Sequence, residues 1–525
     1  MSSPAAMGTS ALLAREDDTL SLRKNAVNIS KLSTIYFAGN VLPRALGLFL
    51  LPVFTAFLVP TQFGIVMLTA RLVGPISLLM QLGLVAGFQW HYFRIEESER
   101  SRFVRTIFLG QFRQALLIGI LLSVGGIWCA DLLLPNLPLN PEFVSMLWLV
   151  IVWTAFCGAF IDLGEAVARI REQAFVAVGI RSLTYLSQLG LGLAVVVGLG
   201  WLGFGRQLAI SIGYAFGALI AIRFLWRLGD GTHETPVYRK TLRTGLTFMP
   251  HTLNGLIATA VNAWLLAKFA SPGALAIFGV ALIFAQLMDL PLLSFVGASH
   301  PTTAKLMTDG SPRARNQQSR LYTLQILGLT CLAVGAAVFA PVAIRVLTAP
   351  EYHEAQWVVR IVILSCLCRG LYLAVAQPVS YIGGGFWLST ASFSSSAIGI
   401  LLGFLLIGPY GAYGAAWAIV AGRMAGMVVA ALVGYRLYPL PWEVTKIVRM
   451  LACGTGLVIA DYYLSPNLTP VLALALKVGL VASLLPLLLL CRAIEPSEAR
   501  RGLEMIKGRL RRFHLRFTSA ASEPS

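Results

Sequence analysis

The stretch "VLPRALGLFLLPVFTAFLVP", residues 41–60, decides which class of fold this chain can adopt. It is apolar over about twenty residues, the length that an α-helix needs to cross the hydrocarbon core of a bilayer. It nevertheless carries Arg44 directly after Pro43. An unpaired charge at the bilayer centre costs about 2.5–3.5 kcal/mol on insertion scales, so this arginine is expected to face protein or water rather than lipid.

Segments of similar length and apolarity recur along the whole chain. The 525 residues are 57% hydrophobic and only 12% charged, whereas a soluble globular protein has about 25% charged residues. The apolar runs are about 20 residues long, which favours helices over the ten-residue alternating strands of a β-barrel. We therefore predict an all-α polytopic membrane protein with about 14 transmembrane helices. The predicted spans are 33–58, 63–90, 107–129, 143–165, 173–198, 207–222, 244–267, 274–299, 322–344, 357–381, 388–407, 413–435, 450–460 with its flanks, and 469–490.

The basic residues are distributed unevenly between the two sides of these spans. Of the 41 lysines and arginines, 30 fall on the side of the N-terminus, eight lie within spans, and three fall in loops on the other side, at Arg206, Lys268 and Arg345. Because cytoplasmic loops carry the excess of Lys and Arg, both termini are predicted to be cytoplasmic. The net charge of +18 is then explained by orientation in the membrane, and no nucleic-acid partner is expected.

Two similar segments divide the predicted spans into halves. "VLPRALGLFLLPVFTAFLVPTQFG" at 41–64 aligns with "TFMPHTLNGLIATAVNAWLLAKFASPGALA" at 247–276, so that Pro43 matches Pro250 and Pro60 matches Pro272. Such a parallel repeat implies two six-helix lobes related by a pseudo-two-fold axis along the membrane normal, with a central cavity between them. The predicted parts are a cytoplasmic N-terminal segment 1–32, an N-lobe 33–225, a cytoplasmic linker 226–243, a C-lobe 244–437, two extra helices in 438–490 and a basic amphipathic cytoplasmic tail 491–525.

Four stretches resemble one superfamily of membrane transporters. They are "VLPRALGLFLLPVFTAFLVPTQFGI" at 41–65, "GLTFMPHTLNGLIATAVNAWLLAKF" at 245–269, "APEYHEAQWVVRIVI" at 349–363 and "GPYGAYGAAWAIVAGRMAG" at 408–426. In their order and their positions relative to the predicted hairpins, they are similar to the Wzx-type oligosaccharide/polysaccharide flippases of the multidrug/oligosaccharidyl-lipid/polysaccharide (MOP) exporter superfamily. The drug-exporting relatives usually have twelve helices, so the extra pair here fits the polysaccharide or lipid II branches better.

The resemblance implies a transporter rather than an enzyme. It would move polyprenyl-pyrophosphate-linked oligosaccharide from the cytoplasmic to the outer leaflet of the bacterial inner membrane by alternating access, for exopolysaccharide, capsule or O-antigen synthesis. Its partners would be membrane lipids, a polysaccharide polymerase and chain-length or export proteins. The alternatives are a lipid II-type flippase, a cation-coupled drug exporter and a membrane glycosyltransferase or polymerase. The chain has no P-loop, HExxH or nucleophile elbow, and no catalytic residue, cofactor or metal is expected.

Arginines dominate the charged residues inside the predicted spans. Arg44 and Arg369 are expected near mid-depth, Arg71 and Arg423 in the outer part, and Arg181 in the inner part of the membrane. Both halves contribute cations, and a guanidinium pairs well with phosphate through its planar fork, so the central cavity is predicted to be cationic and to bind an anion. Arg44 would bind the headgroup pyrophosphate. The alternative is that Arg44 only stabilises helix packing by bonding to carbonyls or to an acidic residue.

The carboxylates inside the spans suggest two pairs. Asp162 and Arg181 match in depth on adjacent spans, which predicts a structural ion pair. Asp289 and His251 also match in depth and would either carry a coupling proton, since imidazole titrates near neutral pH, or form a buried hydrogen bond. Three charged residues near span ends are instead expected to reach the membrane surface: Arg113, Glu165 and Arg360.

Uncharged polar residues in the spans are candidates for hydrogen bonds to sugar hydroxyls. They include Asn40, Asn254, Gln81, Gln89 and Tyr372. Asn and Gln also join membrane helices to one another, and the sequence does not separate the two roles.

The C-terminal segment 497–517 has apolar residues at 503, 506, 510, 513 and 517, which form one helical stripe flanked by arginines. This pattern predicts an interfacial helix on the anionic inner leaflet; the alternative is a segment that binds a partner protein.

Overall fold

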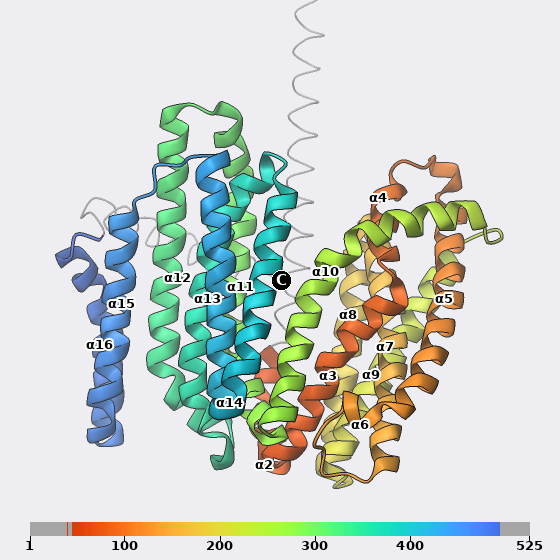
Figure 1. The fold of residues 1–525 in the computed structure, drawn as a ribbon, viewed down its shortest axis with the longest axis horizontal. Helices are drawn as coiled ribbons and strands as arrows, with labels where there is room; N and C mark the ends of the chain where they lie inside the picture. The colour runs from red at the N-terminus through yellow and green to blue at the C-terminus, as the bar shows by residue number, and fades with distance from the viewer. Residues whose placement is uncertain (1–38, 40–44, 494–525) are drawn as a thin grey trace, which may run out of the picture. The chain divides into compact units, whose positions relative to one another are not determined.

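The computed structural model describes residue 39 and residues 45–493 (Figure 1). All regular secondary structure in this part of the chain is helical. The predicted segment 1–32 and the predicted tail helix 497–517 lie outside it. The main helices are α2 (Leu51–Phe57), α3 (Pro60–Gln81), α4 (Leu84–Tyr92), α5 (Arg100–Trp128), α6 (Ala130–Leu133), α7 (Pro141–Ile170), α8 (Ala174–Leu193), α9 (Leu202–Leu228), α10 (Thr235–Phe269), α11 (Pro272–Asp309), α12 (Pro312–Leu347), α13 (Ala355–Tyr381), α14 (Gly385–Leu437), α15 (Val444–Leu464) and α16 (Pro470–Leu490).

Eleven helices of the described residues are long and apolar enough to cross a membrane. One of them, α14, has 53 residues and covers the two predicted spans 388–407 and 413–435. Helix α10 covers the predicted span 244–267 but is not among the eleven, and the predicted span 33–58 lies largely outside the described residues. The prediction of an all-α polytopic membrane protein is therefore confirmed.

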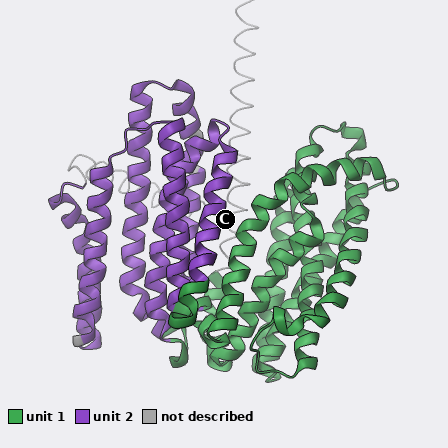
Figure 2. Cartoon of the chain, in the orientation of Figure 1, with its two compact units in different colours: residues 1–279, 346–352, 404–412 green, residues 280–345, 353–403, 413–525 purple. Residues whose placement is uncertain are grey.

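The chain divides into two compact units (Figure 2). Unit 1 contains the chain up to Gly279 together with Val346–Tyr352 and Phe404–Ala412, and unit 2 contains the rest. Unit 1 has a core of large side chains from α4, α5, α7, α8 and α9, centred on Phe88, Phe103 and Phe160. Helix α10, which the repeat assigns to the second lobe, packs on α3 and α4 in unit 1. The lobe boundary drawn from the repeat stays a prediction.

Prolines begin the second helix of both predicted hairpins. Pro60 is the first residue of α3, and Pro272 is the first residue of α11, where a missing N–H costs no intrahelical hydrogen bond. The two helix starts touch: a Cβ added at Gly64 would lie 1.7 Å from the carbonyl oxygen of Pro272, so only glycine fits there. Tyr352 binds the chain just before α3, because its hydroxyl donates to the carbonyl of Leu58 at 2.5 Å.

Helix α14 contains the motif 408–426 and bends within it. Gly411 has φ of 52° and ψ of −126°, a backbone conformation outside the helical region that L side chains rarely adopt. The bend separates the two predicted spans. Their helical halves pack closely, because a Cβ at Gly422 would lie 2.6 Å from the carbonyl oxygen of Ser395. This close contact fixes the position of Arg423, the residue that follows Gly422.

The two extra helices, α15 and α16, pack on unit 2 through an apolar cluster with α12 and through ionic contacts. Asp461 on α15 accepts from Arg360 of α13 and from Lys477 of α16, each at 2.5 Å. Arg360 was predicted to reach the membrane surface, and this was wrong: its side chain is only 11% exposed and pairs with Asp461. Asp461 is fully buried within α15, which extends to Leu464.

Candidate functional site

A cluster of charged residues occupies the interior of unit 2. Asp289 lies on α11 and Arg369 near the middle of α13, and Arg369 Nη1 donates to Asp289 Oδ2 at 2.5 Å. The two helices are in register here, since the Cys366 thiol one turn away on α13 lies 3.8 Å from the carbonyl oxygen of Ala285 on α11. A close approach between α13 and α12 at Gly370, where an added Cβ would clash with Leu329, holds this part of α13 in place.

Arg423 reaches the same cluster from α14. Its Nη1 donates to the Ser365 hydroxyl at 2.9 Å and lies 3.8 Å from the Cys366 sulfur. Cys366 thus contacts Arg423 and, through the carbonyl of Ala285, the turn of α11 that precedes Asp289. Ser365, Cys366 and Arg369 share one face of α13, because residues three and four apart are neighbours on a helix.

The cluster has an excess of positive charge. One carboxylate, Asp289, faces two guanidiniums, and Arg423 has no acidic partner within 4 Å in the described part of the chain. The Arg369 side chain is 35% exposed and the Asp289 side chain 18% exposed. Partly accessible arginines with planar donor forks suit an anion such as phosphate.

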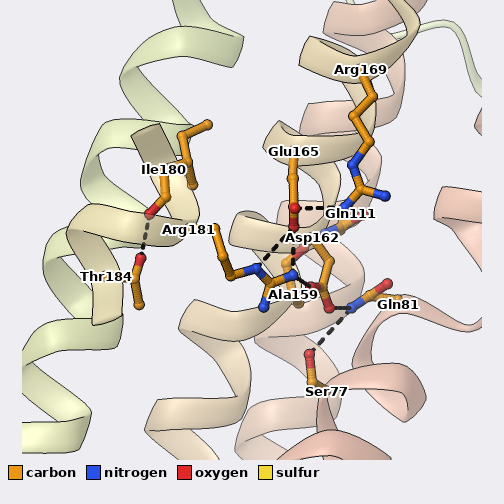
Figure 3. Close-up of polar contacts among 10 residues, drawn as sticks. All are labelled: Ser77, Gln81, Gln111, Ala159, Asp162, Glu165, Arg169, Ile180, Arg181 and Thr184. Atoms are coloured by element: carbon orange, nitrogen blue, oxygen red, sulfur yellow. Dashed lines mark hydrogen bonds and ion pairs between the residues drawn. The ribbon is translucent and has the colours of Figure 1, made fainter. Parts of the chain in front are cut away.

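A charged network of α7 and α8 in unit 1 is instead balanced (Figure 3). Arg181 on α8 bonds to Glu165 through Nε at 3.1 Å and Nη2 at 2.5 Å, and to Asp162 at 3.3 Å. Glu165 also pairs with Arg169 at 2.6 Å. The network holds two carboxylates and two guanidiniums, so it offers no excess charge to an anion. The predicted ion pair of Asp162 and Arg181 is confirmed.

This network borders a cavity inside unit 1. The cavity has a volume of about 410 Å³, and Asp162 and Arg181, each 41% exposed, open onto it. Gln81 on α3 donates to Asp162 Oδ2 at 2.9 Å and to the Ser77 hydroxyl at 3.2 Å. The polar residues that line the cavity are Ser77, Gln81, Gln89, Asp162, Arg181, Tyr214 and Thr252. Its lining thus combines apolar surface with hydroxyl, amide and ionic groups.

The predicted site residues fall into three groups. Arg369, Arg423 and Asp289 come together in unit 2. Arg71 on α3, Arg181 on α8, and Asn254 and His251 on α10 belong to unit 1. Arg44 and Asn40 lie outside the described residues, so their predicted contacts stay predictions.

One assignment from the sequence was wrong, and another stays a prediction. Asp289 forms an ion pair with Arg369 in unit 2, and the predicted pairing of Asp289 with His251, as a coupling site or as a buried hydrogen bond, stays a prediction. Glu165 was predicted to reach the membrane surface, and this was wrong: its side chain is only 12% exposed and holds Arg181. The Asp289–Arg369 contact joins residues 80 positions apart, and the sequence alone gave no depth precise enough to pair them.

Solved structures share this fold at low sequence identity. The lipid II flippase MurJ in an inward closed conformation aligns with a TM-score of 0.68 over 86% of this chain and 97% of that chain, at 12% identity. A multidrug resistance MATE family transporter of the MOP superfamily, in an inward-facing conformation, aligns with a TM-score of 0.61 over 76% and 94%, at 16% identity. A MOP superfamily transporter from Pyrococcus furiosus gives 0.54 over 78% and 95%, at 17% identity.

The chain matches no protein-family model and no curated protein. The structural likeness shows the fold, which is the two-lobed helical fold of MOP superfamily transporters. The chain is therefore a multi-pass membrane protein whose fold is shared with these transporters.

Proposed function

We propose that this protein is a flippase that moves polyprenyl-pyrophosphate-linked oligosaccharide from the cytoplasmic to the outer leaflet of the bacterial inner membrane. The observation that carries the proposal is the excess positive charge of the cluster in unit 2, where two arginines, Arg369 and Arg423, accompany one carboxylate, Asp289. A polyprenyl pyrophosphate carries at least two negative charges next to a long apolar chain. Arg369 and Arg423 would bind the pyrophosphate through their guanidinium forks.

The same charge balance disfavours export of cationic drugs through this cluster. A site for a lipophilic cation would leave a carboxylate uncompensated, whereas here Asp289 is paired and Arg423 has no acidic partner among the residues that the structure describes. The cation-coupled drug exporter is therefore the weaker alternative, despite the likeness to a MATE transporter.

A lipid II-type flippase is the second candidate, and the fold likeness to MurJ favours it. Lipid II is also a polyprenyl pyrophosphate, so the cationic cluster suits both ligands equally. The two functions differ in the sugar part of the substrate. The four sequence stretches at 41–65, 245–269, 349–363 and 408–426 favour the oligosaccharide flippase.

In unit 1, the residues around the cavity suit sugar hydroxyls better than pyrophosphate. Arg181 is already neutralised by Asp162 and Glu165, and a neutral set of amide, hydroxyl and carboxylate groups can donate to and accept from hydroxyls. A volume of about 410 Å³ falls in the range of small-molecule sites. We assign to Gln81, Asp162 and Arg181 the recognition of a sugar, with Asn254 as a further candidate.

The membrane potential would favour export. In a cell with a negative interior, outward movement of a negative charge is favourable by about 2.3 kcal/mol per charge per 100 mV. Arginines that move through the field with the substrate would cancel part of this gain. Alternating access with fixed arginines would need no coupling ion, whereas moving arginines would require one.

Reconstitution tests the substrate class. Purified protein in proteoliposomes should transfer a labelled polyprenyl-pyrophosphate oligosaccharide between leaflets, measured by its accessibility to an added glycosidase. Excess unlabelled lipid-linked oligosaccharide should compete more strongly than lipid II, and a lipophilic cation should not compete. Transport of the cation with no transfer of either lipid would contradict the proposal, and preference for lipid II would establish the second candidate.

A further inference from the structure

The ion pair between Asp289 and Arg369 is only partly satisfied. It is made by one nitrogen, Nη1, and one oxygen, Oδ2. The second carboxylate oxygen, Oδ1, is buried and has no hydrogen-bond partner within the described residues. A guanidinium has five N–H donors and can bind a carboxylate through two parallel bonds. The contact therefore uses a small part of the donor capacity of Arg369 and leaves Asp289 half-bonded.

Two other ion pairs in the chain are built more completely. In unit 1, Arg181 is held by two carboxylates and three bonds. Around α15, Asp461 is fully buried, and each of its oxygens accepts from a different cation. The Arg369 side chain is 35% exposed, comparable to Arg181 at 41%, but a single bond to one carboxylate holds it. The Asp289–Arg369 contact has the geometry of an exchangeable pair.

Arg423, the other cation of the cluster, is held differently. Its Nη1 bonds to the neutral groups of Ser365 and Cys366, so its charge faces no acid within the described residues. Arg423 is thus available to an anion at all times. Arg369 is available only when it leaves Asp289.

We infer that Asp289 is an internal competitor for the substrate's pyrophosphate, occupying Arg369 when the site is empty and giving it up when the anion binds. This inference rests on the proposed function. The pyrophosphate would replace the Asp289 carboxylate on Arg369, so part of the attraction for the substrate is offset by the loss of the internal pair. A ligand shifts such an equilibrium only by its differential affinity for the two states.

The competition gives Asp289 a role in release. A flippase must bind its substrate on one side of the membrane and let it go on the other, and a permanently free pair of arginines would hold a pyrophosphate tightly. When Asp289 recaptures Arg369, the anion loses one of its two cationic partners. Asp289 is therefore a positioning residue that sets affinity and release without touching the substrate.

Binding of an isoprenoid diphosphate that lacks sugar tests the inference. We would measure the affinity of detergent-purified protein for farnesyl diphosphate by calorimetry. Asp289→Asn keeps the side-chain shape and removes the charge, and it should tighten binding about tenfold. Arg369→Ala should weaken it, and adding Asp289→Asn to Arg369→Ala should then have no further effect, because the competitor has lost its target. Asp309→Asn, at the exposed end of the same helix, is the matched control and should bind as the wild type does.

Turnover supplies a second readout. In proteoliposomes, Asp289→Asn should lower both the KM and the kcat for the lipid-linked oligosaccharide, since tighter binding slows release. A role in packing alone would lower the melting temperature without tightening binding. If Asp289→Asn does not yield folded protein, Asp289→Ser removes the same charge with a smaller side chain and should give the same tightening.

The outcomes separate the inference from the function on which it rests. Wild-type binding of farnesyl diphosphate with unchanged affinity in Asp289→Asn and Asp289→Ser would overturn the competition and leave the flippase proposal standing. Absence of diphosphate binding in the wild type and in every variant would overturn both.

Discussion

At the scale of single residues, the charges buried in this chain are distinguished by how completely each is neutralised. Asp461 serves two cations on two different helices, Arg360 and Lys477, and is fully buried. Removing one partner of such a group is costly because it leaves uncompensated charge in a medium of low dielectric constant. Asp461 therefore attaches the α15–α16 hairpin to the body of unit 2.

We predict that Asp461→Asn destabilises the protein by about 3–5 kcal/mol, because it leaves two buried cations without a counter-charge. The measurement is thermal unfolding in detergent. Glu97→Gln, which alters an exposed carboxylate 3.9 Å from Arg100, is the control and should change stability by less than about 1 kcal/mol. Equal melting temperatures for Asp461→Asn and Glu97→Gln would show that the ionic contact does not hold the hairpin.

The sequence predicted some of these pairs and missed others for a physical reason. Asp162 and Arg181 lie on consecutive helices, α7 and α8, so matched depth was enough to pair them. Asp289 was matched in depth with His251, whereas Arg369 was expected nearer mid-depth. The packing of α11 on α13 brings Asp289 into contact with Arg369. Rotation of a helix about its axis is not fixed by hydropathy.

At the scale of helices, glycines control where two backbones can meet. In α14, Gly422 faces the Ser395 carbonyl across the bend, whereas Gly408 in the same helix has no atom within 4 Å of an added Cβ. The motif 408–426 signals a glycine-rich turn in the sequence, but its hydropathy does not reveal which glycines are close-packed. The proline starts of α3 and α11 could be read from the sequence, since proline favours the first turn of a helix.

We expect Gly422→Ala to destabilise the protein by about 1–3 kcal/mol through overpacking against Ser395. It should also weaken pyrophosphate binding, because it displaces the neighbouring Arg423. Gly408→Ala is the matched control and should be neutral or stabilising by up to about 1 kcal/mol, since alanine is the better helix former. The measurement is thermal unfolding of the two variants under the same conditions. A Gly422→Ala protein as stable as the Gly408→Ala protein would rule out the close crossing of the two halves of α14.

At the scale of the whole molecule, the distribution of basic residues and the fold lead to one expected topology. The spans were predictable from apolar length, and twelve of the fourteen correspond to the eleven helices that are apolar and long enough. The ends of the spans were less predictable: α15 runs from Val444 to Leu464, whereas the predicted span was 450–460 with its flanks. The orientation rests on the 30 basic residues on the predicted cytoplasmic side.

Labelling of single cysteines tests that orientation. In a protein whose seven native cysteines are replaced by serine, a cysteine at position 136 should react with an impermeant maleimide added outside. Cysteines at 98 and 312 should react only after the inner face is opened. A label at 312 from outside would contradict both the orientation and the arrangement of the spans.

The central claim is that the arginines of unit 2 bind the pyrophosphate of an exported lipid, and the most direct measurement is leaflet transfer of a labelled polyprenyl-pyrophosphate oligosaccharide by arginine variants in proteoliposomes. Arg423→Ala and Arg369→Ala should each lower the rate at least tenfold, and Arg423→Lys should restore only part of it, because lysine keeps the charge but loses the planar fork. Arg102→Ala, which alters an arginine 59% exposed beside Glu234, should transfer the lipid at the wild-type rate. Wild-type transfer by folded Arg423→Ala and Arg369→Ala proteins would contradict the account.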